Sequence, residues 1–126
     1  MAENKKAKAY TEEEENIGNV QISEQVVAVI AGIAATEVEG VASLVGNITT
    51  ELVSKIGLGS LSKGVKIKMT DDSVMVYVTI DIYYGYSIPE VSRNVQEKVN
   101  AAIENMTGLS VAEVDVTVAD VTLDKK

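Results

Sequence analysis

A run of alternating residues from Val74 to Tyr84 is the feature that most constrains the fold of this chain. Every second residue in it is apolar and mostly branched at Cβ, in the order Val74, Val76, Val78, Ile80, Ile82 and Tyr84. Successive side chains of a strand point to opposite faces of a sheet, so the run predicts a long strand with one strongly apolar face. The intervening residues, Met75, Tyr77, Thr79, Asp81 and Tyr83, are not plainly polar, which leaves the contacts of the second face open.

A shorter strand precedes the long one and is joined to it by a turn. Val65, Ile67 and Met69 alternate with two lysines, which is the pattern of a half-exposed strand. The sequence at 71–73 is Asp-Asp-Ser, and these residue types favour a turn. We therefore expect a β-hairpin here. The two aspartates lack the ligand spacing and the glycine of a calcium loop, so we interpret them as turn residues only.

The first main helix is predicted to begin after Ser23, a good N-cap, and to run to about Glu39 before Gly40. Its residues are almost all apolar or alanine, which indicates that it is mostly buried. Gly32 costs about 1 kcal/mol relative to alanine inside a helix, so it indicates close approach of another element.

The second main helix has stronger signals at both ends. Ser87-Ile88-Pro89-Glu90 forms a capping box with proline in the first turn, and Gly108 closes the helix. Apolar residues fall on one stripe and charged residues lie opposite, which is typical of a surface helix laid on a sheet.

Four shorter features complete the pattern. Gly18–Ile22 and Val41–Val45 are predicted short strands, and the spacing around Leu52 and Ile56 predicts a short amphipathic helix. In the last strand the apolar parity changes near Ala119 and Asp120, which predicts a β-bulge.

The two halves of the chain share the order strand, helix, glycine, strand. We therefore predict a two-layer α+β fold with a βαββαβ-like plan and an extra short helix. Its small mixed or antiparallel sheet carries the two main helices on one face. Residues 1–17 are interpreted as a disordered charged arm, 18–123 as a single domain and 124–126 as a tail.

Composition excludes several functions. The chain has no cysteine and no histidine, which removes thiol nucleophiles, the usual nucleophile–base pairs and the preferred zinc ligands. A net charge of −8 makes nucleic acid an unfavourable partner. The glycine-rich segment 57–64 lacks the ending of a phosphate-binding loop. We therefore expect no catalytic residues, no metal and no cofactor.

Nothing in the sequence indicates a direct membrane anchor. The longest apolar run, Val26 to Ala35, spans ten residues, whereas a membrane-crossing helix needs about 20. The first residues lack the apolar segment of a secretory signal. We expect a cytoplasmic protein, held at any membrane by something else.

The tyrosines are the best functional lead. Alternation places Tyr77 and Tyr83 on the strand face opposite Val76 and Ile80. Tyrosine is a favoured interface anchor, but aromatic pairs across strands also simply stabilise sheets, and both interpretations remain open. The candidate protein-interaction surface consists of Tyr77, Tyr83, Tyr86, Leu52 and Ile56.

Two segments resemble the signature regions of the alkaline shock protein family: VIAGIAATEVEGVASLVGN at 29–47 and YGYSIPEVSRNVQEKVNAAIENMTGLSVAEVDVTVADV at 84–121. The link KGVKI at 63–67 resembles the central strand entry of that family. The resemblance covers about residues 18–123. It implies a cytoplasmic protein of Firmicute-type bacteria tied to general or envelope stress, with no catalytic residues to carry over. Some members lie beneath the membrane by binding a small membrane-anchored relative.

Two functions follow as hypotheses. The first is a non-enzymatic scaffold or adaptor that forms homo-oligomers and docks on a membrane-anchored protein partner. The alternative is a regulator that binds an enzyme of membrane-lipid, for example fatty-acid, synthesis, since other branches of the family are associated with that process.

Overall fold

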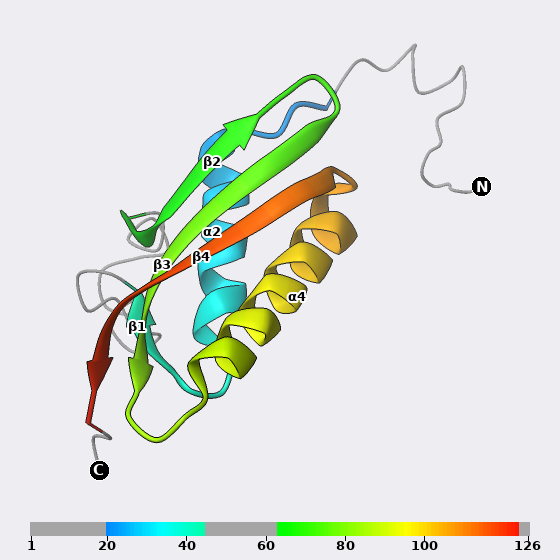
Figure 1. Ribbon diagram of the computed structural model, residues 1–126. Helices are drawn as coiled ribbons and strands as arrows, with labels where there is room; N and C mark the ends of the chain where they lie inside the picture. Colours follow the sequence, from blue (N-terminus) through cyan, green and yellow to red (C-terminus); the bar gives the residue numbers. More distant parts are fainter. Residues whose placement is uncertain (1–19, 45–62, 124–126) are drawn as a thin grey trace.

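The computed structural model describes residues 20–44 and 63–123. Figure 1 shows two helices packed on one side of a small sheet. In chain order the elements are α2 (Glu24–Thr36), β1 (Val41–Leu44), β2 (Val65–Met69), β3 (Ser73–Tyr83), α4 (Ile88–Thr107) and β4 (Ser110–Thr122). The predicted two-layer α+β fold is confirmed.

Strand β3 is the centre of the sheet. It pairs in parallel with β4 over its whole length, from Ser73 to Tyr83. Its other edge is shared by two antiparallel neighbours, β2 along Val74–Val78 and β1 along Ile80–Ile82. The sheet is therefore mixed, and the alternating run of the sequence is its central strand.

The apolar face of β3 forms the sheet side of the hydrophobic core. Val74, Val76, Val78, Ile80 and Ile82 are all buried there under the helices. Helix α2 packs over β1, β2 and β3, helix α4 packs over β4, and the two helices contact each other (Figure 1). Buried alanines of α2 and the stripe of α4, which consists of Val91, Val95, Val99 and Ile103, meet in this layer.

Helix α4 begins and ends where the sequence predicts. The Ser87 side chain accepts a hydrogen bond from the Glu90 backbone N–H at 3.3 Å. Gly108 adopts a left-handed conformation, and its N–H donates to the Glu104 carbonyl at 3.0 Å. The N-cap of α2 is also confirmed, because Ser23 Oγ accepts from the Val26 N–H at 3.1 Å.

The C-terminus of α2 was predicted too late. The helix ends at Thr36, three residues before Glu39, and residues 37–40 form a turn instead. The Val41 N–H donates to the Val38 carbonyl in this turn. Gly40 has φ +98°, so the left-handed step that reverses the chain lies at the glycine while the helix stops earlier.

Three single-residue register shifts shape the sheet. The predicted bulge is confirmed, because Ile80 pairs with Val118 and Asp81 pairs with Asp120, which leaves Ala119 as the extra residue. A second shift leaves Ala112 extra in β4, and a third leaves Ala42 extra in β1; neither was predicted. Each bulge turns the following residues to the other face.

The predicted first strand, Gly18–Ile22, is not found in its described part, because residues 20–22 are irregular. The described order is therefore αβββαβ rather than βαββαβ. The predicted short helix around Leu52 and Ile56, the arm 1–17 and the tail 124–126 lie outside the described residues.

We expect Gly40→Ala to destabilise the fold far more than a matched glycine substitution. An added Cβ at Gly40 would lie 2.8 Å from Val91 Cγ2 and 2.9 Å from Tyr86 Cδ2, whereas at Gly85, with φ +102°, it meets nothing within 4 Å. Backbone strain costs about 1–3 kcal/mol at either site, and overpacking at Gly40 adds about 1–3 kcal/mol. Denaturant unfolding measures both variants, and equal losses would contradict the close packing at Gly40.

Candidate functional site

The face of the sheet opposite the helices is the candidate site. No helix within residues 20–44 and 63–123 lies over it (Figure 1). We call it the open face and define it by Lys66 and Lys68 of β2, by Met75, Tyr77, Thr79, Asp81 and Tyr83 of β3, and by Glu113, Asp115, Thr117, Asp120 and Thr122 of β4. Eight of these twelve residues are exposed: the two lysines, Tyr77 at 36%, and the five residues of β4.

Strand register arranges the open face in rows that run across the sheet. Lys66 is the β2 partner of Tyr77, and Asp115 is its β4 partner. The next row holds Lys68, Met75 and Glu113 in the same order. We call these the Tyr77 row and the Met75 row. The Tyr77 hydroxyl lies 4.0 Å from Met75 Sδ, so the two central side chains lie against each other along β3.

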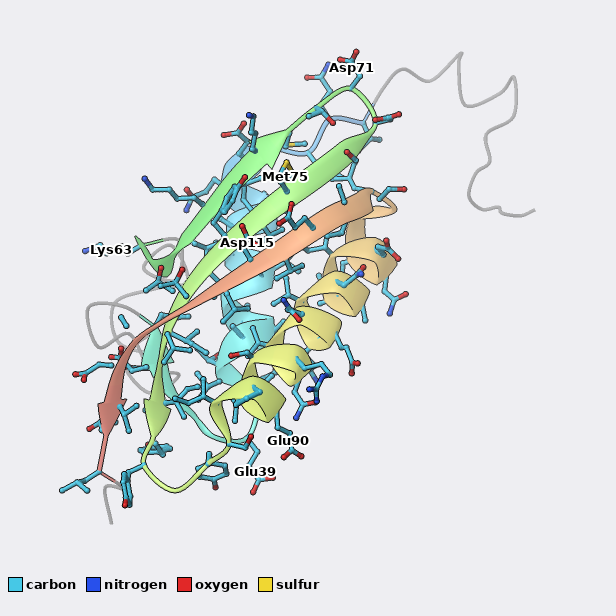
Figure 2. The ribbon with its side chains drawn as sticks, viewed as in Figure 1. Glu39, Lys63, Asp71, Met75, Glu90 and Asp115 are labelled. Carbon is cyan, nitrogen blue, oxygen red and sulfur yellow. The ribbon has the colours of Figure 1, made fainter. Side chains whose placement is uncertain are left out.

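Charge is divided between the two sides of β3. In these two rows the lysines lie on β2 and the acids lie on β4, with the uncharged Tyr77 and Met75 between them. Figure 2 labels Met75 and Asp115 of these rows. Within the described ranges, neither lysine has a carboxylate within salt-bridge distance, and the salt bridge present joins Lys98 of α4 to Glu37. The open face thus presents a positive edge and a negative edge.

The two acids on β4 repel each other. They are two positions apart on one strand, so their side chains share a face. Hydrogen bonding to the neighbouring Asp115 carboxylate, which favours the protonated form of Glu113, and repulsion by the Asp115 charge raise the pKa of Glu113 above its ordinary value. The negative edge is therefore a place where an added cation would be favourable.

At the other end of the open face, Asp81 has a structural contact. Ser43 Oγ donates to Asp81 Oδ2 at 3.2 Å, and Ser43 is 6% exposed. Asp81 is half-buried and ties β1 to β3. This contact accounts for an acid in the middle of the central strand.

The structure separates the predicted tyrosines. Tyr77 and Tyr83 both lie on the open face. Tyr86 does not: it follows β3, its ring packs against Gly40, and its hydroxyl lies 3.5 Å from Glu39 Oε2. It holds the α2–β1 turn against the start of α4. Leu52 and Ile56, the remaining members of the candidate surface, lie outside the described residues.

Sequence reasoning missed the charged members of the open face. The alternation of Lys66 and Lys68 placed them on an exposed strand face, but nothing local connects them with Glu113 and Asp115. The missing signal was the bulge at Ala112, which the parity change between Val111 and Val114 indicates. A reader of the sequence who does not place this bulge cannot tell on which face of the sheet Glu113 and Asp115 lie.

The described residues give little support for other sites. No group of three or more possible metal-binding side chains occurs among residues 20–44 and 63–123. In the same ranges, neither helix has the length and apolar character needed to cross a membrane.

The family model of alkaline shock protein 23, described as having a cell envelope-related function, matches residues 12–123. The chain belongs to the alkaline shock protein family. Its resemblance to that family in sequence is therefore confirmed over nearly the whole chain.

Relatives within the alkaline shock protein family come from Firmicutes. The uncharacterized protein YqhY of Bacillus subtilis is 40% identical over 114 residues, which are 90% of this chain and 84% of YqhY. Spy1535 of Streptococcus pyogenes is 37% identical, over 88% of this chain and 84% of the relative. A stress response regulator gls24 homolog of Streptococcus pyogenes is 27% identical, over 82% of this chain and 59% of the relative.

Solved structures of the MamM C-terminal domain cover 78% of this chain and 98% of that domain, at a TM-score of 0.49 and 12% identity. That likeness is too distant to bear on function. The description of the family names the cell envelope, and that of the gls24 relative names stress response; neither names an enzymatic reaction.

We expect Asp115→Asn to lower the pKa of Glu113 toward its ordinary value, because hydrogen bonding to Asp115 and repulsion by its charge are the two largest causes of the shift. Asp120→Asn is the matched control, since Asp120 follows the Ala119 bulge and lies seven positions from Glu113. An NMR titration that follows the Glu113 carboxyl carbon measures both. An unchanged pKa in Asp115→Asn would show that the two acids do not share a face.

Proposed function

We propose that this protein is a non-enzymatic scaffold or adaptor of the cell-envelope stress response, which self-associates and docks on a membrane-anchored protein partner. The observation that carries the proposal is the open face. Its exposed tyrosine, methionine and charges are mounted on a central strand that is paired along its length and packed underneath by two helices.

The open face suits a protein partner better than a small molecule. Small ligands bind in concave sites that bury most of their surface, whereas a sheet face is broad. Tyrosine offers a large contact area and has few side-chain rotations to lose, which favours protein interfaces. The paired strands below keep these side chains in place before binding, which lowers the entropic cost of association.

The charge of the chain supports attachment through a protein. Cytoplasmic membrane surfaces carry anionic lipids, which attract clusters of lysine and arginine. This chain has a net charge of −8, and its open face offers two lysines beside several acids. Direct electrostatic binding to such a surface is unfavourable, so a membrane-anchored protein is the better link.

The chemistry of the chain supports a non-enzymatic role. No cysteine or histidine occurs in the sequence, and the half-buried acid Asp81 is already engaged by Ser43. Nucleophilic catalysis needs an activating base beside the nucleophile, and histidine is the commonest such base.

An affinity pull-down from solubilised cells tests docking. We expect wild type to recover a small membrane protein, and the double variant Tyr77→Ser, Tyr83→Ser to lose it. Tyr84→Ser is the matched control: Tyr84 is 73% exposed, but it follows β3 and is not part of the open face. Circular dichroism checks that both variants are folded.

The remaining outcomes of the pull-down are also decisive. A membrane protein that the double variant retains would remove the open face from docking. Recovery of a lipid-synthesis enzyme in its place would replace the scaffold with a regulator of that enzyme.

A further inference from the structure

The rows of the open face are self-complementary. In both rows the lysine lies on β2, the neighbour of β3 on one side, and the acid lies on β4, the neighbour on the other side. Neighbouring strands are about 4.8 Å apart, so lysine and acid are equally far from β3. The central positions, Tyr77 and Met75, are uncharged.

This pattern selects one way of stacking two copies. A two-fold axis that runs along β3, in the plane of the open face, lays the β2 side of one copy over the β4 side of the other. It keeps each residue at its height along the strand, so lysines meet acids of the same row. A two-fold axis across the strands would instead lay β2 over β2 and bring lysines together.

We propose that two copies of this chain pack open face against open face about a two-fold axis along β3. Lys66 of each copy then meets Asp115 of the other, and Lys68 meets Glu113. This inference rests on the self-association proposed above and gives it a surface and a symmetry. A two-fold contact of this kind is closed, so it produces a dimer.

Tyr77 and Met75 form the centre of the dimer contact. Both lie on β3 and therefore on the axis, so each meets its own counterpart. Aromatic pairs and sulfur–aromatic contacts are favourable at such positions. The four lysine–acid pairs surround this apolar centre, which is the usual arrangement of an interface core and its rim.

The dimer also relieves a repulsion within each copy. Two carboxylates, Glu113 and Asp115, lie two positions apart on one face of β4, and the described residues provide no cation at salt-bridge distance. In the dimer, Lys68 and Lys66 of the second copy place a positive charge beside Glu113 and Asp115. The attraction between these lysines and acids favours the face-to-face dimer over the monomer, in which the acids have no cation beside them.

Asp81 sets the limit of the contact. It lies on β3 four positions from Tyr77, about 13 Å away, and would approach its own counterpart if the two strands stayed aligned. Stacked sheets cross at about 30°, so their central strands diverge away from the crossing point. We therefore place the crossing at the Tyr77 and Met75 rows, where the charges match.

The size of the open face indicates a weak dimer. Three strands are about 14 Å wide and the 11 residues of β3 are about 36 Å long, so each copy contributes about 500 Å². The total of about 1,000 Å² is at the lower end for specific interfaces. Dimerisation should therefore depend on protein concentration.

The same charges have a simpler interpretation, because lysines and acids on outer strands also prevent unwanted pairing between sheet edges. In a different assembly, β2 of one copy would pair edge-to-edge with β4 of the next and form growing chains. Particle size and the effect of charge reversal distinguish a monomer, growing chains and the face-to-face dimer.

Charge reversal followed by mixing tests the pairing. We expect K66E/K68E and E113K/D115K each to weaken dimerisation by about tenfold or more, because every pair becomes repulsive. An equimolar mixture of the two should restore a dimer containing one copy of each, since an acidic open face then meets a basic one. The fourfold variant K66E/K68E/E113K/D115K should dimerise alone. Analytical ultracentrifugation at low salt measures all four samples.

Several outcomes would overturn the pairing. If wild type dimerises and both charge variants dimerise equally well, self-association stands but the open face is not its surface. If wild type is monomeric at the highest concentrations, the self-association part of the proposed function fails as well. Particles that grow beyond a dimer indicate edge-to-edge chains.

Cross-linking tests the symmetry independently of charge. The chain has no cysteine, so Tyr77→Cys provides one thiol at the proposed axis. Stacked sheets are about 10 Å apart, and a bis-maleimide of similar length should join two copies efficiently. Glu97→Cys, on an exposed position of α4, is the matched control. Equal cross-linking of both variants would contradict the axis along β3.

Discussion

The parallel pairing of β3 with β4 is the constraint on which the rest of the structure depends. Parallel neighbours need a connection that crosses from one end of the sheet to the other, and α4 provides it with 20 residues. Its apolar stripe of valines and Ile103 needs cover, so α4 lies against the apolar face of the sheet and α2 fills the space beside it. Both helices then lie on one face (Figure 1). The opposite face carries Tyr77 and the charged rows.

Much of the fold was predictable because its signals are local. Alternation from Val74 to Tyr84 identified the central strand, and Ser87 with Pro89 and Gly108 fixed the limits of α4. The bulge at Ala119 was predictable because apolar residues before and after it have opposite parity. The end of α2 was less predictable, because residues 37–39 are compatible with a helix and only the tertiary contacts of Gly40 with Val91 and Tyr86 favour the turn.

The candidate site was predictable only in part, because it depends on pairing between distant strands. Alternation alone placed Tyr77 and Tyr83 on one face, and the structure has them there. The match of Lys66 with Asp115 depends on the antiparallel register of β2, the parallel register of β4 and the Ala112 bulge together. Tyr86 had the same residue type as the other candidates, but its position after Gly85 turns it toward Glu39 and away from the sheet.

Membership of the alkaline shock protein family and an open face with matched charges together favour a role based on protein contacts at the cell envelope. The most direct measurement is a dilution series of backbone amide NMR spectra of wild type. Face-to-face packing predicts that the amides of Lys66, Tyr77 and Asp115 shift with concentration while those of exposed α4 residues such as Glu97 stay fixed. Shifts that leave Tyr77 unchanged and follow the outer edges of β2 and β4, or that occur on α4, would contradict a contact through the open face.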